Sequence, residues 1–146
     1  MARNLSKEFA TLTRRALDMT RPMLERFDGF YPFGLALDNG GALVSVPVCG
    51  DEDQPSGPLI EALRLTMRAA AVQRRFTATA VVYDATLSVR ETGRDFDVVA
   101  MELDDRHGRS IVSYVPYSDE GVGCAFGEAI IDPGDFEIFG DLPAGG

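Results

Sequence analysis

The first thirty residues carry apolar side chains at the spacing of an amphipathic α-helix, every three or four positions. The stripe consists of Leu5, Phe9, Leu12, Ala16, Met19, Met23 and Phe27. Asn4 or Ser6 can cap the start of this helix by accepting hydrogen bonds from its first backbone N–H groups. Pro22 has no N–H to donate, so we expect it to kink the helix or to end it near Thr20. Gly29 then stops the segment.

A β-hairpin is predicted where two short apolar runs flank Asp38-Asn39-Gly40-Gly41, because Asn-Gly supplies the positive φ angles of a tight turn. A second helix follows an acidic loop, with Ser56 as its cap and Pro58 in its first turn. Its apolar face is formed by Leu59, Ile60, Leu63, Met67, Ala70 and Ala71. The arginines expected to point outward are Arg64, Arg68 and Arg75.

From Phe76 onward the pattern changes to that of β-strands separated by short polar turns. The expected strands are TATAVVYDATLSV, FDVVAMEL, SIVSYVPY, CAFGEAII and a last short FEIF. Their regular spacing and the lack of helical runs between them indicate an antiparallel meander.

This order of elements predicts an α+β fold of two layers. Two main helices would pack on one face of an antiparallel sheet of five or more strands, in the order α-β-β-α-β-β-β-β. The chain of 146 residues is long enough for one domain with its own core. We place that domain at residues 1–140 and expect residues 141–146 to form a flexible tail.

The same order resembles, in topology only, the roadblock and profilin-like folds, in which a hairpin and a meander are joined through a helix. The opening FYPFGLAL (residues 30–37), followed by VVYDATL (residues 81–87), also resembles a group of bacterial proteins of unassigned function with an F-x-P-F-G opening. This second resemblance would extend from about Phe30 to Phe139. It brings no known active site, so it implies no role for any single residue.

Composition predicts a cytoplasmic globular protein. Hydrophobic residues make up 45% of the chain and charged residues 25%, and no apolar stretch approaches the 18 or so residues of a membrane helix. The basic, amphipathic N-terminus lacks an apolar signal core; it could serve as a transit peptide, but it fits a structural helix equally well. Cys49 and Cys124 show no metal-binding or disulfide pattern, which is typical of a reducing compartment.

The net charge of −9 argues against nucleic-acid binding, which requires a basic surface. The charge is unevenly distributed: residues 1–26 and residues 58–76 each carry +3, whereas residues 118–146 carry −7. An acidic surface of this kind can attract a basic partner. Alternatively, the acidic loops only keep the protein in solution.

A catalytic histidine is not expected. His107, the only histidine, lies in the turn DDRHGR, where Asp104 or Asp105 could orient it as a general base. However, no serine or cysteine nucleophile is placed beside it by the sequence. A solvated turn residue is the simpler interpretation.

The acidic clusters do not predict a metal site either. Asp51, Glu52 and Asp53 lack the alternating spacing of a calcium loop, and Glu102 with Asp104 would need a third acid and a lysine, although Lys7 is the only lysine. The glycines of GVGCAFG have neither the lysine nor the following helix of a phosphate-binding loop. We therefore expect no cofactor, no metal and no catalytic residue.

The segment RFDGFYPFG (residues 26–34) contains four of the thirteen aromatic residues. In one interpretation it is a corner between helix and strand, in which Phe27 completes the helix stripe, Phe30 or Tyr31 packs over the corner, and Phe33 enters the core. Gly34 would allow another group to approach closely. In the alternative interpretation these aromatic residues line a ligand pocket.

The residues proposed for that pocket are Phe30, Tyr31 and Phe33, with Asp84 and Glu102 as its polar groups. Candidate contacts with a protein partner are Tyr114 and Tyr117, on either side of a strand-breaking Pro116, and the acidic residues Asp51, Glu52 and Asp53. Tyrosines next to a proline at a sheet edge suit either contact or packing.

Three functions remain open. The first is a non-catalytic cytoplasmic interaction or adaptor protein, which we expect to be a homodimer and which includes the case of an immunity-type protein masking a basic partner. The alternative is a small-molecule-binding protein or metal-assisted enzyme with a pocket between helix and sheet. A structural subunit of a larger assembly is the third.

Overall fold

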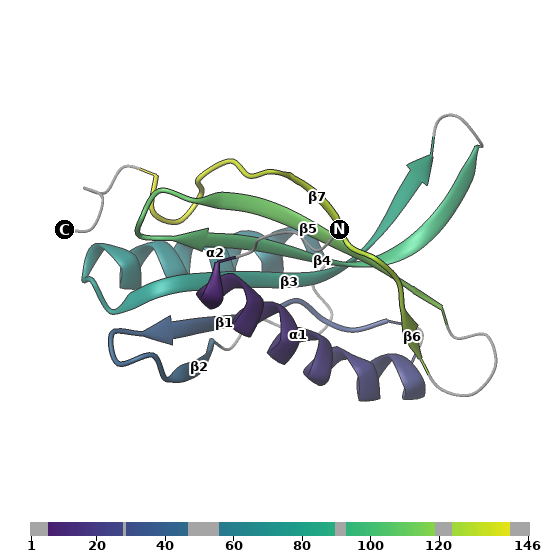
Figure 1. Ribbon diagram of the computed structural model, residues 1–146, viewed down its shortest axis with the longest axis horizontal. Coiled ribbons are helices and arrows are strands. Elements are labelled where there is room, and N and C mark those ends of the chain that lie inside the picture. Colours follow the sequence, from purple (N-terminus) through teal and green to yellow (C-terminus); the bar gives the residue numbers. More distant parts are fainter. Residues whose placement is uncertain (1–5, 28, 47–55, 90–92, 119–123, 141–146) are drawn as a thin grey trace.

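The computed structural model describes residues 6–27, 29–46, 56–89, 93–118 and 124–140. These form two helices and a seven-stranded antiparallel sheet (Figure 1). The elements are α1 (Lys7–Arg26), β1 (Phe33–Asp38), β2 (Leu43–Val46), α2 (Ser56–Val72), β3 (Phe76–Val89), β4 (Arg94–Asp105), β5 (Ser110–Ser118), β6 (Ala125–Phe126) and β7 (Ile130–Pro133). The strands lie in the order β2-β1-β3-β4-β5-β6, and β7 also pairs with β5. The α+β class is confirmed, and the order of elements roughly matches the predicted one, with five strands after α2 in place of the predicted four.

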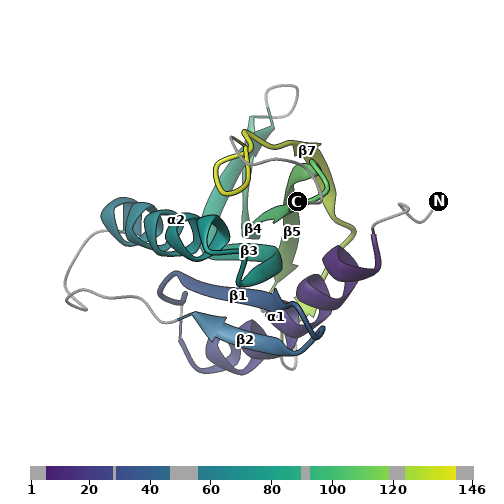
Figure 2. The same cartoon turned by 90° about the vertical axis from the view of Figure 1, so that its left-hand side faces the viewer.

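The two helices lie on opposite faces of the sheet (Figure 2). Leu35 and Leu37 of β1 pack in one cluster with α1, whereas Ala36 between them packs in a second cluster with α2. The expected placement of both helices on one face is therefore wrong. The physical reason is that β1 is apolar at both odd and even positions, so each of its faces has to be covered.

Helix α1 begins as predicted at Ser6, whose Oγ accepts a hydrogen bond of 3.1 Å from the backbone N–H of Phe9. The helix does not end near Thr20 but continues past Pro22 to Arg26. Because Pro22 and Asp18 are both exposed, the carbonyl that loses its intrahelical donor lies on the solvent side. The proline is tolerated there.

The buried stripe of α1 differs from the predicted one in its second half. It consists of Phe9, Leu12, Ala16, Thr20 and Leu24. Met19 is 36% exposed and Phe27 is 63% exposed. Phe27 therefore does not complete the stripe, and its ring is available at the surface.

Helix α2 packs closely on β1 because Gly34 has no side chain. A Cβ atom at this position would overlap the Cε atom of Met67 and lie 3.1 Å from the Cβ atom of Val46. The predicted close approach at Gly34 is confirmed. The predicted apolar face of α2 is likewise buried, at Leu59, Leu63, Met67, Ala70 and Ala71.

The hairpin between β1 and β2 is also present. Its positive φ angle, +83°, falls on Gly41 and not on Asn39-Gly40. The Oδ1 atom of Asp38 accepts hydrogen bonds of 2.9 Å from the backbone N–H groups of Gly40 and Ala42, so the aspartate side chain stabilises the turn.

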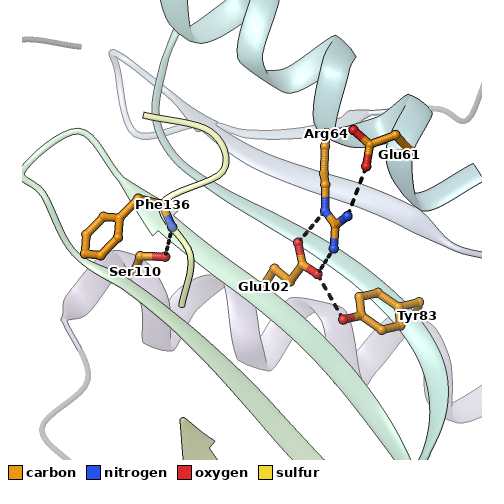
Figure 3. A network of polar contacts seen from close by, with 6 residues as sticks. All are labelled: Glu61, Arg64, Tyr83, Glu102, Ser110 and Phe136. Atoms are coloured by element: carbon orange, nitrogen blue, oxygen red, sulfur yellow. Dashed lines mark hydrogen bonds and ion pairs between the residues drawn. The ribbon is translucent and has the colours of Figure 1, made fainter. Parts of the chain in front are cut away.

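Residues 136–139, expected to be a last strand, form a turn instead. Phe136 has a φ of +56°, and its backbone N–H donates to the Oγ atom of Ser110 at 3.1 Å (Figure 3). The turn buries Ile138 and Phe139 in the cluster on the α2 face. Packing of these two side chains outweighs the strand preference of the sequence.

The hairpin of β3 and β4 extends beyond the rest of the sheet. Its pairing continues to Val89 and Arg94, whereas β5 pairs with β4 only from Val98 onward. A two-stranded arm therefore projects from the sheet (Figure 1). No helix in the described part of the chain has the length and apolarity needed to cross a membrane.

Candidate functional site

A cleft of about 610 Å³ lies at the C-terminal end of α1. Its lining combines the end of α1, the segment that follows it, the start of α2 and one residue of β3. These residues, which we call the aromatic–carboxylate cleft, are Met23, Phe27, Gly29, Phe30, Tyr31, Ser56 and Asp84. Segments far apart in the sequence thus meet at one place on the surface.

The aromatic residues of the cleft divide into one anchored ring and two exposed rings. Phe30 is half-buried, packs on the α1-side core and contacts Phe33 at 5.9 Å between ring centroids. Phe27 and Tyr31 are 63% and 60% exposed. Large exposed aromatic side chains gathered around a hollow are typical of a contact site.

Among the described lining residues, Asp84 is the one that carries a carboxylate. It pairs across the sheet with Val99, a core residue on the α1 face, and cross-strand partners share a face. Its Oδ1 atom accepts a hydrogen bond of 2.8 Å from the hydroxyl of Tyr117. Burial raises the pKa of Asp84, and the hydrogen bond from Tyr117 partly offsets this shift.

Gly29 allows the backbone to reach this carboxylate. A Cβ atom on Gly29 would overlap the Oδ2 atom of Asp84, so the segment after α1 lies directly against it. Burial, together with the nearby Asp84 carboxylate, raises the pKa of Tyr117. Tyr117 therefore remains a hydrogen-bond donor to Asp84 at neutral pH and fixes the orientation of the carboxylate.

No arginine, lysine or histidine among the described residues forms an ion pair with Asp84. The guanidinium group of Arg26 lies 5.9 Å from the centroid of the Phe27 ring, which lines the cleft. This guanidinium stacks on the aromatic wall and does not pair with the carboxylate.

Glu102 lies on the opposite face of the sheet, so the predicted pocket does not unite it with Asp84. It pairs with Val81, a core residue of the α2 face. In the pairing of β3 with β4, Glu102 lies opposite Val81 and Asp84 lies opposite Val99, three positions further along β3. Successive side chains of a strand alternate between faces, so this odd separation places the two carboxylates on opposite faces. The inclusion of Glu102 in the pocket is therefore wrong.

Glu102 is instead part of an ion pair between the sheet and α2 (Figure 3). The Nε atom of Arg64 donates to its Oε1 atom at 2.9 Å, and the Arg64 Nη2 atom donates to its Oε2 atom. The hydroxyl of Tyr83 donates to Oε2 at 2.9 Å. Arg64, expected to point outward, turns inward because a buried carboxylate requires a partner.

This ion pair has the properties of a structural contact. The hydrogen bonds that Arg64 donates to Glu102 raise the pKa of Arg64. Burial and the adjacent Glu102 raise the pKa of Tyr83. The two shifts hold Arg64 and Tyr83 in their ordinary protonation states, so neither of these two groups is poised to exchange a proton near neutral pH.

The structure thus brings together Phe30, Tyr31 and Asp84 from the predicted pocket, with Phe33 packed behind Phe30. Of the predicted partner contacts, Tyr117 supports the carboxylate of the cleft, and Tyr114 is half-buried on the α2 face opposite Ala100. The remaining ones, Asp51, Glu52 and Asp53, lie outside the described residues.

Sequence reasoning missed Met23, Phe27, Gly29 and Ser56 as lining residues. The density of aromatic residues in RFDGFYPFG was the available signal. Phe27 was assigned to the helix stripe because its spacing fits, although α1 ends one residue before it.

The turn that contains His107 is held by hydrogen bonds to Asp105. The Oδ1 atom of Asp105 accepts hydrogen bonds from the backbone N–H groups of His107, at 2.9 Å, and Arg109, at 3.0 Å, so this carboxylate stabilises the turn. Asp104 is 3% exposed, and burial raises its pKa to about 6. Within the described ranges, no group of three or more His, Cys, Asp or Glu residues is placed to hold a metal ion.

Comparison of the chain with protein-family models, with curated proteins and with solved structures gives no significant match. The resemblance of the FYPFG opening to a bacterial group stays a prediction. Inference about function therefore rests on the cleft itself.

Proposed function

We propose that the protein is a non-catalytic binding protein that takes a small organic molecule into the aromatic–carboxylate cleft. The observation that carries this proposal is the convergence of two exposed aromatic rings, Phe27 and Tyr31, with the half-buried carboxylate of Asp84 around one hollow. Ligand sites are generally concave, largely apolar and furnished with few oriented polar groups. The volume of about 610 Å³ falls within the range of roughly 300–1,000 Å³ that such sites span.

The chemistry of the lining favours binding over catalysis. Among the described residues that form it, the polar side chains are one carboxylate, one tyrosine and one serine. The carboxylate is engaged by Tyr117, and the serine has no general base beside it in the lining. Acid–base or nucleophilic catalysis requires a nucleophile and an oriented base within hydrogen-bond reach.

A fragment screen by ligand-observed NMR tests this proposal. Ser56→Trp would place a large ring at the exposed edge of the cleft. Leu65→Trp is the matched control, since Leu65 is a 60% exposed residue of the same helix that does not line the cleft. We expect fragments to bind the natural protein and the Leu65→Trp variant but not the Ser56→Trp variant. Fragments that bind all three proteins equally, or none of them, would contradict the proposal.

An adaptor function toward a basic protein is the second candidate. It is favoured by the edge of the sheet at β7, where Glu128, Asp132 and Asp135 are exposed beside the apolar side chains of Ile130 and Phe136. Charges of one sign around apolar contacts suit a partner of opposite charge. In this form the protein is also expected to be a homodimer that uses an open sheet edge.

A pull-down eluted in two salt steps separates the two candidates. The adaptor function predicts a basic protein that binds at low salt and elutes at high salt. The double substitution Asp132→Asn/Asp135→Asn would abolish its capture. The matched control is Asp95→Asn/Asp97→Asn, two exposed acids on the arm of β3 and β4. Equal capture by both variants would exclude the β7 edge as the contact.

A further inference from the structure

We infer that the ligand of the aromatic–carboxylate cleft is a small organic ammonium ion, such as a quaternary amine. This inference rests on the proposed function, because it names the class of molecule that the proposed site takes. It follows from three properties of the described lining: its aromatic walls, a carboxylate without a cationic partner among the described residues, and the lack of a second carboxylate there.

The aromatic walls offer ring faces to a cation. A cation within about 6 Å of a ring centroid is attracted by the negative face of the ring, and quaternary ammonium ligands are commonly held in this way. The Phe27 ring already accepts such a contact from the guanidinium of Arg26, at 5.9 Å from its centroid. Phe30 and Tyr31 line the same hollow, so an ammonium ion inside it would contact aromatic side chains from more than one direction.

The carboxylate of Asp84 supplies the opposite charge. The buried Asp104 is stabilised by a hydrogen bond with Ser110, whereas the buried Glu102 and Asp105 each have an arginine partner, Arg64 and Arg109. Asp84 has no such partner among the described residues. The neighbouring Asp97 adds negative charge and, with burial, raises the pKa of Asp84. A cation entering the cleft would provide the compensation that the chain provides elsewhere.

Other ligand classes fit less well. A metal ion such as Ca²⁺ requires six or more oxygen ligands, whereas the described residues of the lining supply one carboxylate. An anion would be repelled by Asp84. A neutral apolar ligand would bury the carboxylate further without a partner, which costs free energy. An organic ammonium ion uses both the apolar walls and the charge.

Choline and its uncharged carbon analogue, 3,3-dimethylbutan-1-ol, provide the test, because they share the same shape and differ in charge. Each is titrated into ¹⁵N-labelled protein and followed by chemical-shift changes at Gly29, Phe30, Tyr31 and Asp84. We expect choline to bind at least about tenfold more tightly than the alcohol. The Asp84→Asn variant, which keeps an acceptor for Tyr117, would reduce the preference for choline to the part that the aromatic rings contribute. The control Asp95→Asn, at an exposed acid of β4 outside the lining, would retain the preference.

The outcomes separate this inference from the proposed function. Equal binding of choline and the alcohol overturns the ammonium ligand and leaves a neutral-ligand cleft in place. An Asp84→Asn variant that keeps the full preference for choline also overturns it. A stronger response to N-acetyl-lysine-N-methylamide than to choline assigns the cleft to a lysine of a protein partner and overturns the small-molecule ligand. If neither choline nor the alcohol binds but the fragment screen finds neutral ligands of the cleft, the ammonium inference fails and the proposed function stands. If the screen also finds no ligand, both the inference and the proposed function fail.

Discussion

Asp84 and Glu102 lie on adjacent strands but on opposite faces of the sheet, because their cross-strand partners Val99 and Val81 belong to different cores. Glu102 is satisfied within the protein by Arg64 and Tyr83. Asp84 opens onto the aromatic–carboxylate cleft with only Tyr117 as its side-chain donor among the described residues. The two carboxylates therefore have different tasks: one joins α2 to the sheet and the other is available to a ligand.

The first prediction concerns the ion pair between α2 and the sheet. Arg64→Met leaves the mostly buried Glu102 with Tyr83 alone, and we expect the free energy of unfolding to fall by about 2–4 kcal/mol. Denaturant unfolding measures the loss. The control Arg68→Met, at an exposed position of the same helix, should change stability by less than about 0.5 kcal/mol. A similar small change for both variants would show that the ion pair contributes no net stability.

The second prediction concerns the dependence of stability on pH. The folded-state pKa of Asp104, about 6, lies above its ordinary value of 3.8, so the folded protein binds this proton more tightly than the unfolded chain. The resulting stabilisation is complete below pH 3.8 and is lost as the pH rises through about 6. Relative to Asp104→Asn, the natural protein should therefore lose roughly 1 kcal/mol of stability between pH 5 and pH 7. A difference that does not vary with pH in urea titrations would contradict the shift.

The third prediction concerns the close packing of α2 on β1. Gly34→Ala introduces a Cβ atom that overlaps Met67 and crowds Val46, and we expect it to reduce stability by about 1–3 kcal/mol. At Gly57, in the first turn of α2, the same atom meets nothing within 4 Å. Gly57→Ala should therefore be neutral or stabilising by up to about 1 kcal/mol. Thermal unfolding of the two variants distinguishes packing from backbone effects. Equal changes in melting temperature would argue against the overlap of the new Cβ atom with Met67.

The fourth prediction concerns the support that Tyr117 gives to Asp84. Tyr117→Phe removes the hydrogen bond that lowers the pKa of Asp84, so we expect this pKa to rise further. A ¹³C NMR titration of the side-chain carboxyl group measures it directly. Tyr114→Phe is the control, because Tyr114 lies on the other face, opposite Ala100. An unchanged titration of Asp84 in Tyr117→Phe would show that the hydroxyl has no influence on the carboxylate.

The fifth prediction concerns the dependence of choline binding on pH. A cation favours the ionised form of Asp84, so choline affinity should be full above the pKa of Asp84 and should weaken as the pH falls through it. Among the described residues, Tyr117 of β5 and Asp97 of β4 act on this carboxylate, Tyr31 lines the same cleft, and Arg26 of α1 contacts the Phe27 ring. Calorimetric titrations at several pH values measure the affinity. In Asp84→Asn the dependence should disappear; if it persists, another group controls binding.

Much of the fold could be predicted because its local signals agree. The Ser6 cap, the turn at Asp38 and the apolar face of α2 each depend on residues close in sequence. The faces on which the helices pack could not be predicted in the same way. They depend on which positions of β1 meet which helix, and an apolar run such as FGLALD permits either arrangement.

The aromatic part of the candidate site could be predicted from the sequence, but the choice between its two proposed carboxylates could not, for a related reason. The aromatic cluster around Phe30 and Tyr31 is visible in the sequence, but the face on which Asp84 or Glu102 lies depends on the register between β3 and β4. That register is fixed by pairing over the length of the arm, and a shift of one residue would exchange the two faces. The orientation of Arg64 was predicted wrongly because the sequence does not show that its partner on the sheet is Glu102.

The turn at residues 136–139 also bears on how the protein is made. The α1-side core is assembled from residues between Phe9 and Cys124, whereas the α2-side core requires Ile138 and Phe139. During synthesis from the N-terminus, one side of the sheet can therefore be covered before the other. Until those two residues emerge, Ala36 and Val81 face an incomplete layer, and this exposed apolar surface is where a nascent chain would need protection from aggregation.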